Sequence, residues 1–503
     1  MNRQNNQGLS RRDFLCNTGR TAAVTGGGLM LANTMASVAA AEQDGTDGFR
    51  VGWATVSITP DKPVQLAGQF HERVSTEGML YPCVATALAM EKTGPDDQHE
   101  QAILVACDLV NVGREYVSDI RQRVAELLPD FDSAKLSINT THTHTGPTLN
   151  PGSYKAPDPG VMGPEAYAPF FCERAAEAAV QAWRARRTAA MNHAVGHAAV
   201  GFNRIAAYAD GSSRMYGNSA QSDFVGLEGG HDHGLELVFL WRDAATLSGI
   251  IINIACPAQV VEGQRYLSAD FWGPVRETIK KTYGEDVSVY PMISAAGDQS
   301  PRDLVRRGRN EPDMRAESGM REMARRIVNG VRDAYANTQS ERDANPVFRH
   351  HSEAITLPTR RVTAEELAEA QQERERLLSE NDIAPGSRDA AMLRRANGII
   401  DRYERAETSF AMDLHVLRIG DVAVATNPFE LYLDYGLRIK GRSPANQTLV
   451  VQLANDRGRY LPTPHAVEGG AYGARITENI VGPEGGDVLV EKTLDAINLL
   501  WEA

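Results

Sequence analysis

The chain has 503 residues and a formal net charge of −13. Its first 41 residues carry four arginines and one aspartate, so the remainder has a net charge near −16. A protein this acidic is a poor candidate for binding nucleic acid, and beyond residue 41 no apolar stretch is long enough to form a transmembrane segment.

The first 41 residues have the features of an export signal. Ser10-Arg11-Arg12-Asp13-Phe14-Leu15 resembles a twin-arginine motif, a weakly apolar segment rich in glycine and alanine follows it, and Ala39-Ala40-Ala41 offers a cleavage site. We therefore expect residues 1–41 to be a signal peptide. The twin-arginine route would export the protein already folded, so we expect it to be periplasmic or secreted.

Four cysteines follow this signal peptide, and each stands alone in an apolar context. They are Cys83, Cys107, Cys172 and Cys256, and no two of them have a paired spacing. Isolated cysteines of this kind are typical of buried free thiols rather than of a disulfide framework.

Strand and helix patterns alternate along the mature chain. Runs typical of strands occupy 49–59, 84–91, 101–109, 133–138, 192–201, 235–241, 249–254, 287–293, 414–419, 422–426 and 448–453. Helical spacing occurs at 116–128, 167–186, 271–282, 317–337 and 492–501. No linker divides the chain, so we expect a single large mixed α/β metallohydrolase-like domain over residues 49–503.

One segment differs in composition from the rest of this domain. Residues 363–408 are rich in Glu, Arg, Ala and Leu with helical periodicity, and Pro385-Gly386 interrupts them once. This pattern predicts an inserted helical hairpin on the outside of the domain, with its charges in solvent.

A pair of histidines lies where one predicted strand gives way to a turn. His142 and His144 follow the run 133–138 and precede Gly146-Pro147. Alternate side chains of an extended segment share a face, so the two imidazoles are expected to project together. Two imidazoles at a strand end suit metal ligation combined with proton transfer, although a solvated pair of loop histidines would have the same spacing.

Further polar segments follow other strands. Gly297-Asp298-Gln299-Ser300-Pro301 presents a hydroxyl beside a carboxylate, which suits nucleophile or oxyanion chemistry but is also ordinary turn composition. Glu430 follows a strand and precedes a helix, where the helix dipole alone would favour it. Arg204 ends a predicted strand, where a surface arginine is ordinary. Tyr460 and Tyr472 each lie beside a turn, and taken singly each is typical of a ring packed at a loop edge.

Together these segments resemble a known family. The run 141–147, Asn203-Arg204, Gly297 to Pro301, Glu430, and 455–460 with Tyr472 occur in the order found in neutral/alkaline non-lysosomal ceramidases. The resemblance covers the chain from about Val51 to its carboxyl terminus and is to the amino-terminal catalytic domain of that family. The chain ends soon after the Tyr472 region, so no carboxyl-terminal immunoglobulin-like domain is expected.

The resemblance implies a zinc amidase that cleaves the N-acyl bond of ceramide. It assigns His142, Glu430 and Tyr460 as zinc ligands and His144 as the proton-transfer group. It further assigns Arg204 to the polar head of the substrate, Ser300 and Asp298 to the catalytic turn, and Tyr472 to a hydrogen bond with the amide carbonyl. The implied cofactor is Zn2+, and the implied partner is a small-molecule or lipid N-acyl substrate.

The chain departs from the family at two positions. A second zinc histidine of the family is expected after Ala255-Cys256, where this chain has Pro257, and proline cannot bind zinc. His142, Glu430 and Tyr460 could suffice as three protein ligands, or Cys256, His231 or His233 could supply a fourth. The second departure is Arg302, where the family has asparagine.

These residues leave three functions open. The first is a ceramidase-like amidohydrolase in which zinc-activated water attacks the acyl carbonyl. The second is a non-catalytic envelope protein that binds lipid or glycan on the same fold. The third is a metal-independent serine hydrolase that uses Ser300.

Overall fold

A computed structural model describes residues 48–94, 99–242, 246–306, 314–338, 342–379, 383 and 388–502. The predicted signal peptide and the break at Pro385-Gly386 lie outside these residues. No helix in the described ranges is both long enough and apolar enough to cross a membrane. The four described cysteines are buried free thiols, as predicted.

Within the described residues, the largest sheet has eight strands in the order β14-β13-β12-β7-β1-β4-β5-β6. The strands are β1 (Gly48–Ser57), β4 (Val84–Thr93), β5 (His99–Cys107), β6 (Leu136–Thr140), β7 (Arg187–His197), β12 (Gly234–Arg242), β13 (Thr246–Ile254) and β14 (Ser288–Ile293). The pairs β5–β6 and β13–β14 are parallel, and the other neighbours are antiparallel. The sheet is therefore mixed.

A second sheet packs against the first. It has the order β16-β17-β18-β20, formed by β16 (Phe348–Pro358), β17 (Ser409–Ile419), β18 (Val422–Thr426) and β20 (Gln447–Val451). Successive residues of β13 show the packing, because Ile251 lies in the core between the sheets whereas Ile250 and Ile252 face helices. Both faces of such a strand are buried, which explains its continuous apolar run.

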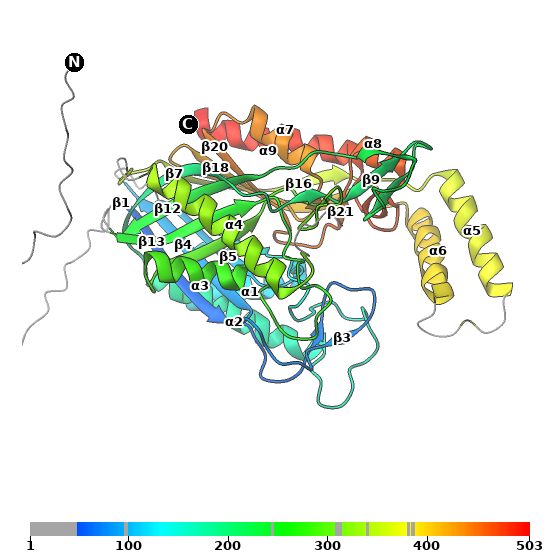
Figure 1. The fold of residues 1–503 in the computed structure, drawn as a ribbon. Coiled ribbons are helices and arrows are strands. Elements are labelled where there is room, and N and C mark those ends of the chain that lie inside the picture. The colour runs from blue at the N-terminus through cyan, green and yellow to red at the C-terminus, as the bar shows by residue number, and fades with distance from the viewer. Residues whose placement is uncertain are drawn as a thin grey trace, which may run out of the picture. The chain divides into compact units, whose positions relative to one another are not determined.

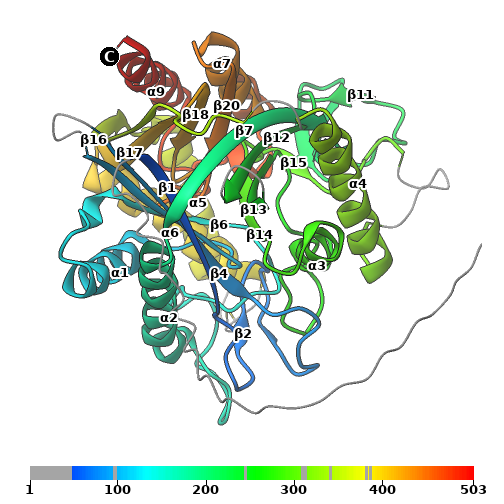
Figure 2. The ribbon, with the colours of Figure 1, turned by 90° about the vertical axis from the view of Figure 1, so that its left-hand side faces the viewer.

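Helices cover the outer face of each sheet. The large sheet is covered by α1 (Arg114–Leu127), α2 (Pro164–Arg184), α3 (Trp272–Tyr283) and α4 (Glu317–Ala336), and the smaller one by α7 (Leu433–Arg442) and α9 (Pro483–Glu502). Figures 1 and 2 show α7 and α9 on one side of the two sheets and α1, α2 and α3 on the other. The architecture is a four-layer α/β/β/α sandwich, so the predicted mixed α/β class is confirmed.

Strand ends from both sheets meet at one place. The Asn455 N–H donates to the Ile138 carbonyl of β6 (2.9 Å), and the Gln452 N–H donates to the Ile293 carbonyl of β14 (3.0 Å). These bonds bring the carboxyl ends of β6, β14 and β20 together. Loops at the carboxyl ends of strands are where α/β proteins commonly place their ligands.

The two helices predicted within 363–408 are present as α5 (Ala364–Ser379) and α6 (Arg388–Arg405). They pack on one another at an edge of the fold, away from the two sheets (Figure 1). Their small core includes Ile476 from the segment that follows Tyr472. The hairpin therefore contacts the domain close to the strand ends.

Several short elements were not predicted from the sequence. They are β2 (Gln65–Leu66), β3 (Arg73–Val74), β8 (Phe202–Asn203), β9 (Ile205–Tyr208), β10 (Ser213–Met215), β11 (Phe224–Leu227), β15 (Gln299–Ser300), β19 (Glu430–Leu431), β21 (Tyr460–Leu461), α8 (Pro464–Gly469), and the 3-10 turns Ser133–Lys135 and Tyr472–Ala474. Most of them carry or border side chains of the candidate site.

Candidate active site

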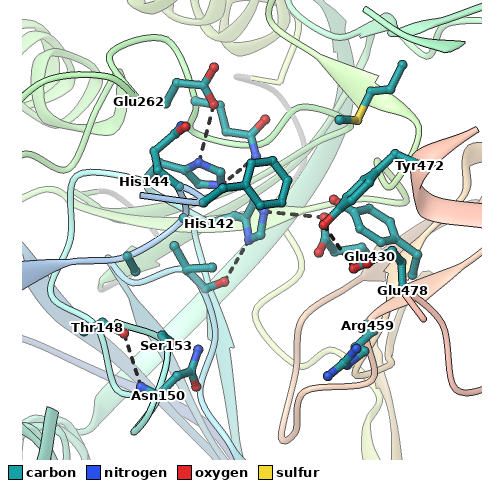
Figure 3. A pocket seen from close by; sticks show the side chains of 18 of the residues that line it. His142, His144, Thr148, Asn150, Ser153, Glu262, Glu430, Arg459, Tyr472 and Glu478 are labelled. Atoms are coloured by element: carbon teal, nitrogen blue, oxygen red, sulfur yellow. Dashed lines mark hydrogen bonds and ion pairs between the residues drawn. The ribbon is translucent and has the colours of Figure 1, made fainter. Parts of the chain in front are cut away.

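A pocket of about 620 Å³ opens at the strand ends. It is lined by six of the predicted site residues, namely His142, His144, Arg204, Glu430, Tyr460 and Tyr472. Figure 3 shows the histidines against one wall and Glu430 and Tyr472 opposite them. Segments separated by more than 300 positions therefore converge here.

His142 occupies the centre of this group. Strand β6 ends at Thr140, and His142 adopts a left-handed backbone conformation (φ 57°), so strand alternation does not set its direction. Its Nδ1 lies 2.8 Å from the Val110 carbonyl oxygen, which requires a proton on Nδ1 and leaves the Nε2 lone pair free. Burial lowers the pKa of His142 to about 4, so the ring is neutral at physiological pH.

Glu430 faces the free nitrogen of this imidazole. Its Oε2 is 3.5 Å from His142 Nε2, which is long for a hydrogen bond. Glu430 lies opposite Tyr460 in the parallel pair β19–β21. Arg204 donates to the Tyr460 hydroxyl (3.1 Å) and lies 3.9 Å from the Glu430 carboxylate.

His142, Glu430 and Tyr460 are the three zinc ligands that the family resemblance implies. Two ligands on one zinc ion, each at about 2.1 Å and in tetrahedral geometry, are roughly 3.4 Å apart, which is close to the His142–Glu430 separation. The described residues contain no group of three or more His, Cys, Asp or Glu side chains that could hold a metal, so a third protein ligand would have to be a donor of another kind, and the family resemblance implies the Tyr460 phenol, which lines the same pocket. Of the zinc ligands that the resemblance implies, His142 and Glu430 therefore lie at a separation that suits one zinc ion.

His144 lies beside His142, with ring centroids 5.0 Å apart. The buried Arg73 guanidinium donates to the His144 carbonyl (2.6 Å), and Gly68 (φ 92°) packs so closely that a Cβ there would lie 2.3 Å from the imidazole ring. Arg73 therefore restrains the backbone of His144, and Gly68 restrains its imidazole ring.

Two residues that sequence analysis did not select contact the His144 ring. Glu262 Oε2 lies 3.4 Å from Nδ1, and Gln259 Nε2 lies 2.9 Å from Nε2. Burial raises the pKa of Glu262, but the hydrogen bond and charge of His144 and the guanidinium of Arg302 outweigh it and lower the pKa to about 2. Arg302, the second departure from the family, forms an ion pair with Glu262.

The Gly-Asp-Gln-Ser-Pro segment lies behind the pocket. The Asp298 carboxylate accepts hydrogen bonds from the Leu433 N–H (2.9 Å) and from the Asn203 amide (2.9 Å), which holds the segments bearing Glu430 and Arg204. Ser300 is fully buried, and in the described structure its hydroxyl accepts from the Tyr216 hydroxyl (3.3 Å) and the Arg302 N–H (3.2 Å). Neither Asp298 nor Ser300 is among the described residues that line the pocket.

The three alternatives for a fourth ligand lie outside the described pocket lining. Cys256 donates to the Val200 carbonyl (3.2 Å), and burial raises the pKa of its thiol. His231 Nδ1 accepts from the Asn203 N–H (2.8 Å), and His233 Nε2 lies 3.1 Å from the Gly201 carbonyl. All three therefore support the loop that precedes Arg204.

Backbone strain also concentrates at the pocket. Seven described non-glycine residues have a positive φ, and three of them, His142, Tyr216 and Arg459, line the pocket. Such conformations are costly for bulky side chains and cluster at functional sites. The guanidinium groups of Arg204 and Arg302 both lie over the Tyr216 ring, 5.9 and 5.1 Å from its centroid.

The fold is that of the neutral ceramidases. Neutral ceramidase from Pseudomonas aeruginosa matches with a TM-score of 0.65 and 14% sequence identity, over 90% of this chain and 75% of that chain. A solved ceramidase complexed with C2 matches with the same TM-score, identity and coverage. The fold expected from the motifs is thus confirmed. No protein-family model and no curated protein sequence matches the chain.

Proposed function

We propose that this protein hydrolyses an N-acyl amide bond with a zinc ion as cofactor. The observation that carries the proposal is the separation of 3.5 Å between His142 Nε2 and Glu430 Oε2, with His144 beside them in one pocket. His142, Glu430 and Tyr460 would hold the zinc. Zinc bound by three protein ligands supplies Lewis acidity and lowers the pKa of a bound water toward about 7.

The other side chains of the pocket would move the proton and stabilise charge. His144 is the group that takes a proton from the attacking water and returns it to the leaving amine, once the Gln259 amide that now donates to Nε2 gives way to that water. The Glu262 carboxylate at Nδ1 stabilises the imidazolium formed in between. Arg204, which is buried and fixed by the Gly297 carbonyl (2.8 Å), places a positive charge where the oxyanion develops.

Tyr472 has a different role in this scheme from the one that the family resemblance implies. Its hydroxyl donates to the Glu478 carboxylate (3.0 Å), so its proton is already engaged. The ring packs edge-on against Tyr460 at 5.9 Å. Tyr472 therefore buttresses the Tyr460 phenol and forms one wall of the pocket.

The test is amine release from a panel of N-acyl substrates by protein loaded with zinc. Wild-type protein is expected to turn over at least one of them, and His142→Ala and Glu430→Gln to lose about 10³-fold or more of that activity while remaining folded by circular dichroism. Full activity in either variant would refute the assignment of these two residues.

A second function is favoured by one specific observation. By the family resemblance Pro257 stands where a zinc histidine is expected, and the nearby side chain that reaches the site, Gln259, contacts His144. This substitution favours a protein that binds its ligand without turning it over. Binding of an N-acyl compound with no hydrolysis in the presence of zinc would establish this function instead.

A further inference from the structure

Most of the side chains that line the pocket carry a polar group, and this limits which substrates the pocket can bind. Seventeen of the twenty-two described lining residues have polar or charged side chains, and these include three arginines and three glutamates. The five others are Ala67, Gly68, Phe70, Val110 and Met215. Pockets for apolar ligands are lined mainly by hydrophobic side chains, whereas here four tyrosine rings and five apolar residues share the lining with charged and amide groups.

The polar groups are distributed over the whole depth of the pocket. His142, His144, Arg204 and Gln259 are buried at its base. Figure 3 shows Thr148, Asn150 and Ser153 on one wall, with Arg459, Tyr472 and Glu478 across from them. An elongated substrate would therefore meet hydrogen-bonding groups from the scissile bond to the mouth.

Aliphatic chains would be bound poorly by these walls. A chain laid over Arg459 or Glu478 removes water from a charge and offers no hydrogen bond in return. The apolar lining residues are few and small, apart from Phe70 and Met215, which favours a short acyl group.

Hydroxyl groups match the same walls. A carboxylate or carboxamide oxygen accepts a hydrogen bond from a hydroxyl, and guanidinium and amide groups donate to it. At the mouth Phe70 is 83% exposed and meets Tyr472 edge-on at 5.6 Å, so an aromatic face stands free beside polar groups. This combination suits a ring that has one apolar face and a rim of hydroxyls.

We propose that the pocket binds a hydroxyl-rich N-acyl amine with a short acyl group, of the class of N-acetylated amino sugars. The proposal rests on the amidase function proposed above and names its substrate class. Gln69, which lines the pocket on the Phe70 loop, is the side chain chosen to test it. The matched control is Gln372, which is exposed on α5 and outside the described lining.

The experiment compares kcat/KM for N-acetylglucosamine and its short oligomers with that for short- and long-chain ceramides in detergent. The expected result is a preference for the amino sugars of about 10²-fold or more, because a site built for hydrogen bonds rejects ligands that lack them. Gln69→Leu is expected to lower kcat/KM for the amino sugar about 3- to 10-fold, and Gln372→Leu to leave it unchanged.

Two other results would overturn the substrate class. Ceramide hydrolysis equal to or faster than that of the amino sugars would refute it and leave the amidase function standing. Release of amine from none of these compounds, nor from N-acyl amino acids, would refute the amidase function itself. An effect of Gln69→Leu no larger than that of Gln372→Leu would remove Gln69 from the binding surface and contradict the proposed position of the sugar.

Discussion

Replacing Gly297 with alanine perturbs the site without changing any side chain of the proposed mechanism, although the Gly297 carbonyl also accepts from Arg204. Gly297 begins the Gly-Asp-Gln-Ser-Pro segment and packs against the backbone of β19. A Cβ at this position would lie 2.2 Å from the Glu430 carbonyl oxygen and 2.7 Å from its carbonyl carbon. The Gly297 N–H donates to the Leu431 carbonyl (2.8 Å), so the two backbones are tied together where the clash would form.

The size of the effect follows from these distances. Real Cβ atoms do not approach other atoms closer than 3.0 Å, so the two segments must separate by about 1 Å. Overpacking of this kind costs about 1–3 kcal/mol of stability. A displacement of about 1 Å at a reacting group costs about 10²-fold in rate, which is about 2.7 kcal/mol in activation free energy. Gly297→Ala is therefore expected to keep its fold and lose about 99% of its activity.

The assay is amine release combined with urea unfolding of the same preparation. Gly441→Ala is the control, because Gly441 lies on α7 downstream of Glu430 and a Cβ there meets open space. That variant is expected to retain full activity and to gain up to about 1 kcal/mol of stability. Wild-type activity in folded Gly297→Ala would show that the positions of Glu430 and of Arg204, which bonds to the Gly297 carbonyl, do not limit the reaction, and the proposed role of Glu430 would be wrong.

Three further predictions concern other parts of the same framework. Glu262→Gln is expected to lower kcat about 10-fold or more with little change in KM, because His144 loses its carboxylate partner; an unchanged kcat would refute that role. The buried His350 has a pKa lowered to about 4 by desolvation, so its neutral form stabilises the fold above pH 6.5 and this contribution falls as the pH drops toward 4. When the pH is lowered from 7 to 5, the free energy of unfolding measured in urea should fall by about 2 kcal/mol less for His350→Gln than for wild type. Equal decreases in the two proteins would contradict this prediction. Asn455→Ala should cost about 1–3 kcal/mol in urea unfolding, because the Ile138 N–H loses its acceptor (2.8 Å), and a smaller loss would show that the backbone bonds alone hold β6.

The sequence predicted the strands whose apolar runs are long. These strands lie between two buried faces, so their apolar character is continuous and their position is evident without tertiary information. Strand β16 was missed because polar residues interrupt its pattern. Buried His350 on β16 bonds to His415 on β17 (3.0 Å), a pairing that only the folded sheet reveals.

The site residues at strand ends were also accessible from the sequence. His142, His144 and Glu430 follow apolar runs, and the structure places all three in one pocket. The sequence predicted that strand alternation would bring the two histidines together. In the structure His142 has a left-handed backbone conformation, so strand alternation does not explain their proximity. Pairs of two-residue strands such as β19–β21 are too short for any periodicity to reveal.

Side-chain direction within turns was not accessible in the same way. The sequence presented Ser300 as a hydroxyl at a tight turn, but it cannot show that Tyr216 stands between that hydroxyl and the pocket. Glu262 was missed because its importance lies in a contact with His144, 118 positions earlier. An acidic residue closing the apolar run after Pro257 was the one local signal that could have identified it.

The most direct test of the central claim is amine release from an N-acyl substrate before chelation, after chelation and after zinc is restored. Wild-type protein is expected to lose its activity with the chelator and regain it with zinc, and His142→Ala to be inactive in all three states. Hydrolysis that continues unchanged in chelated protein would contradict the claim that His142, Glu430 and Tyr460 act by holding a metal ion.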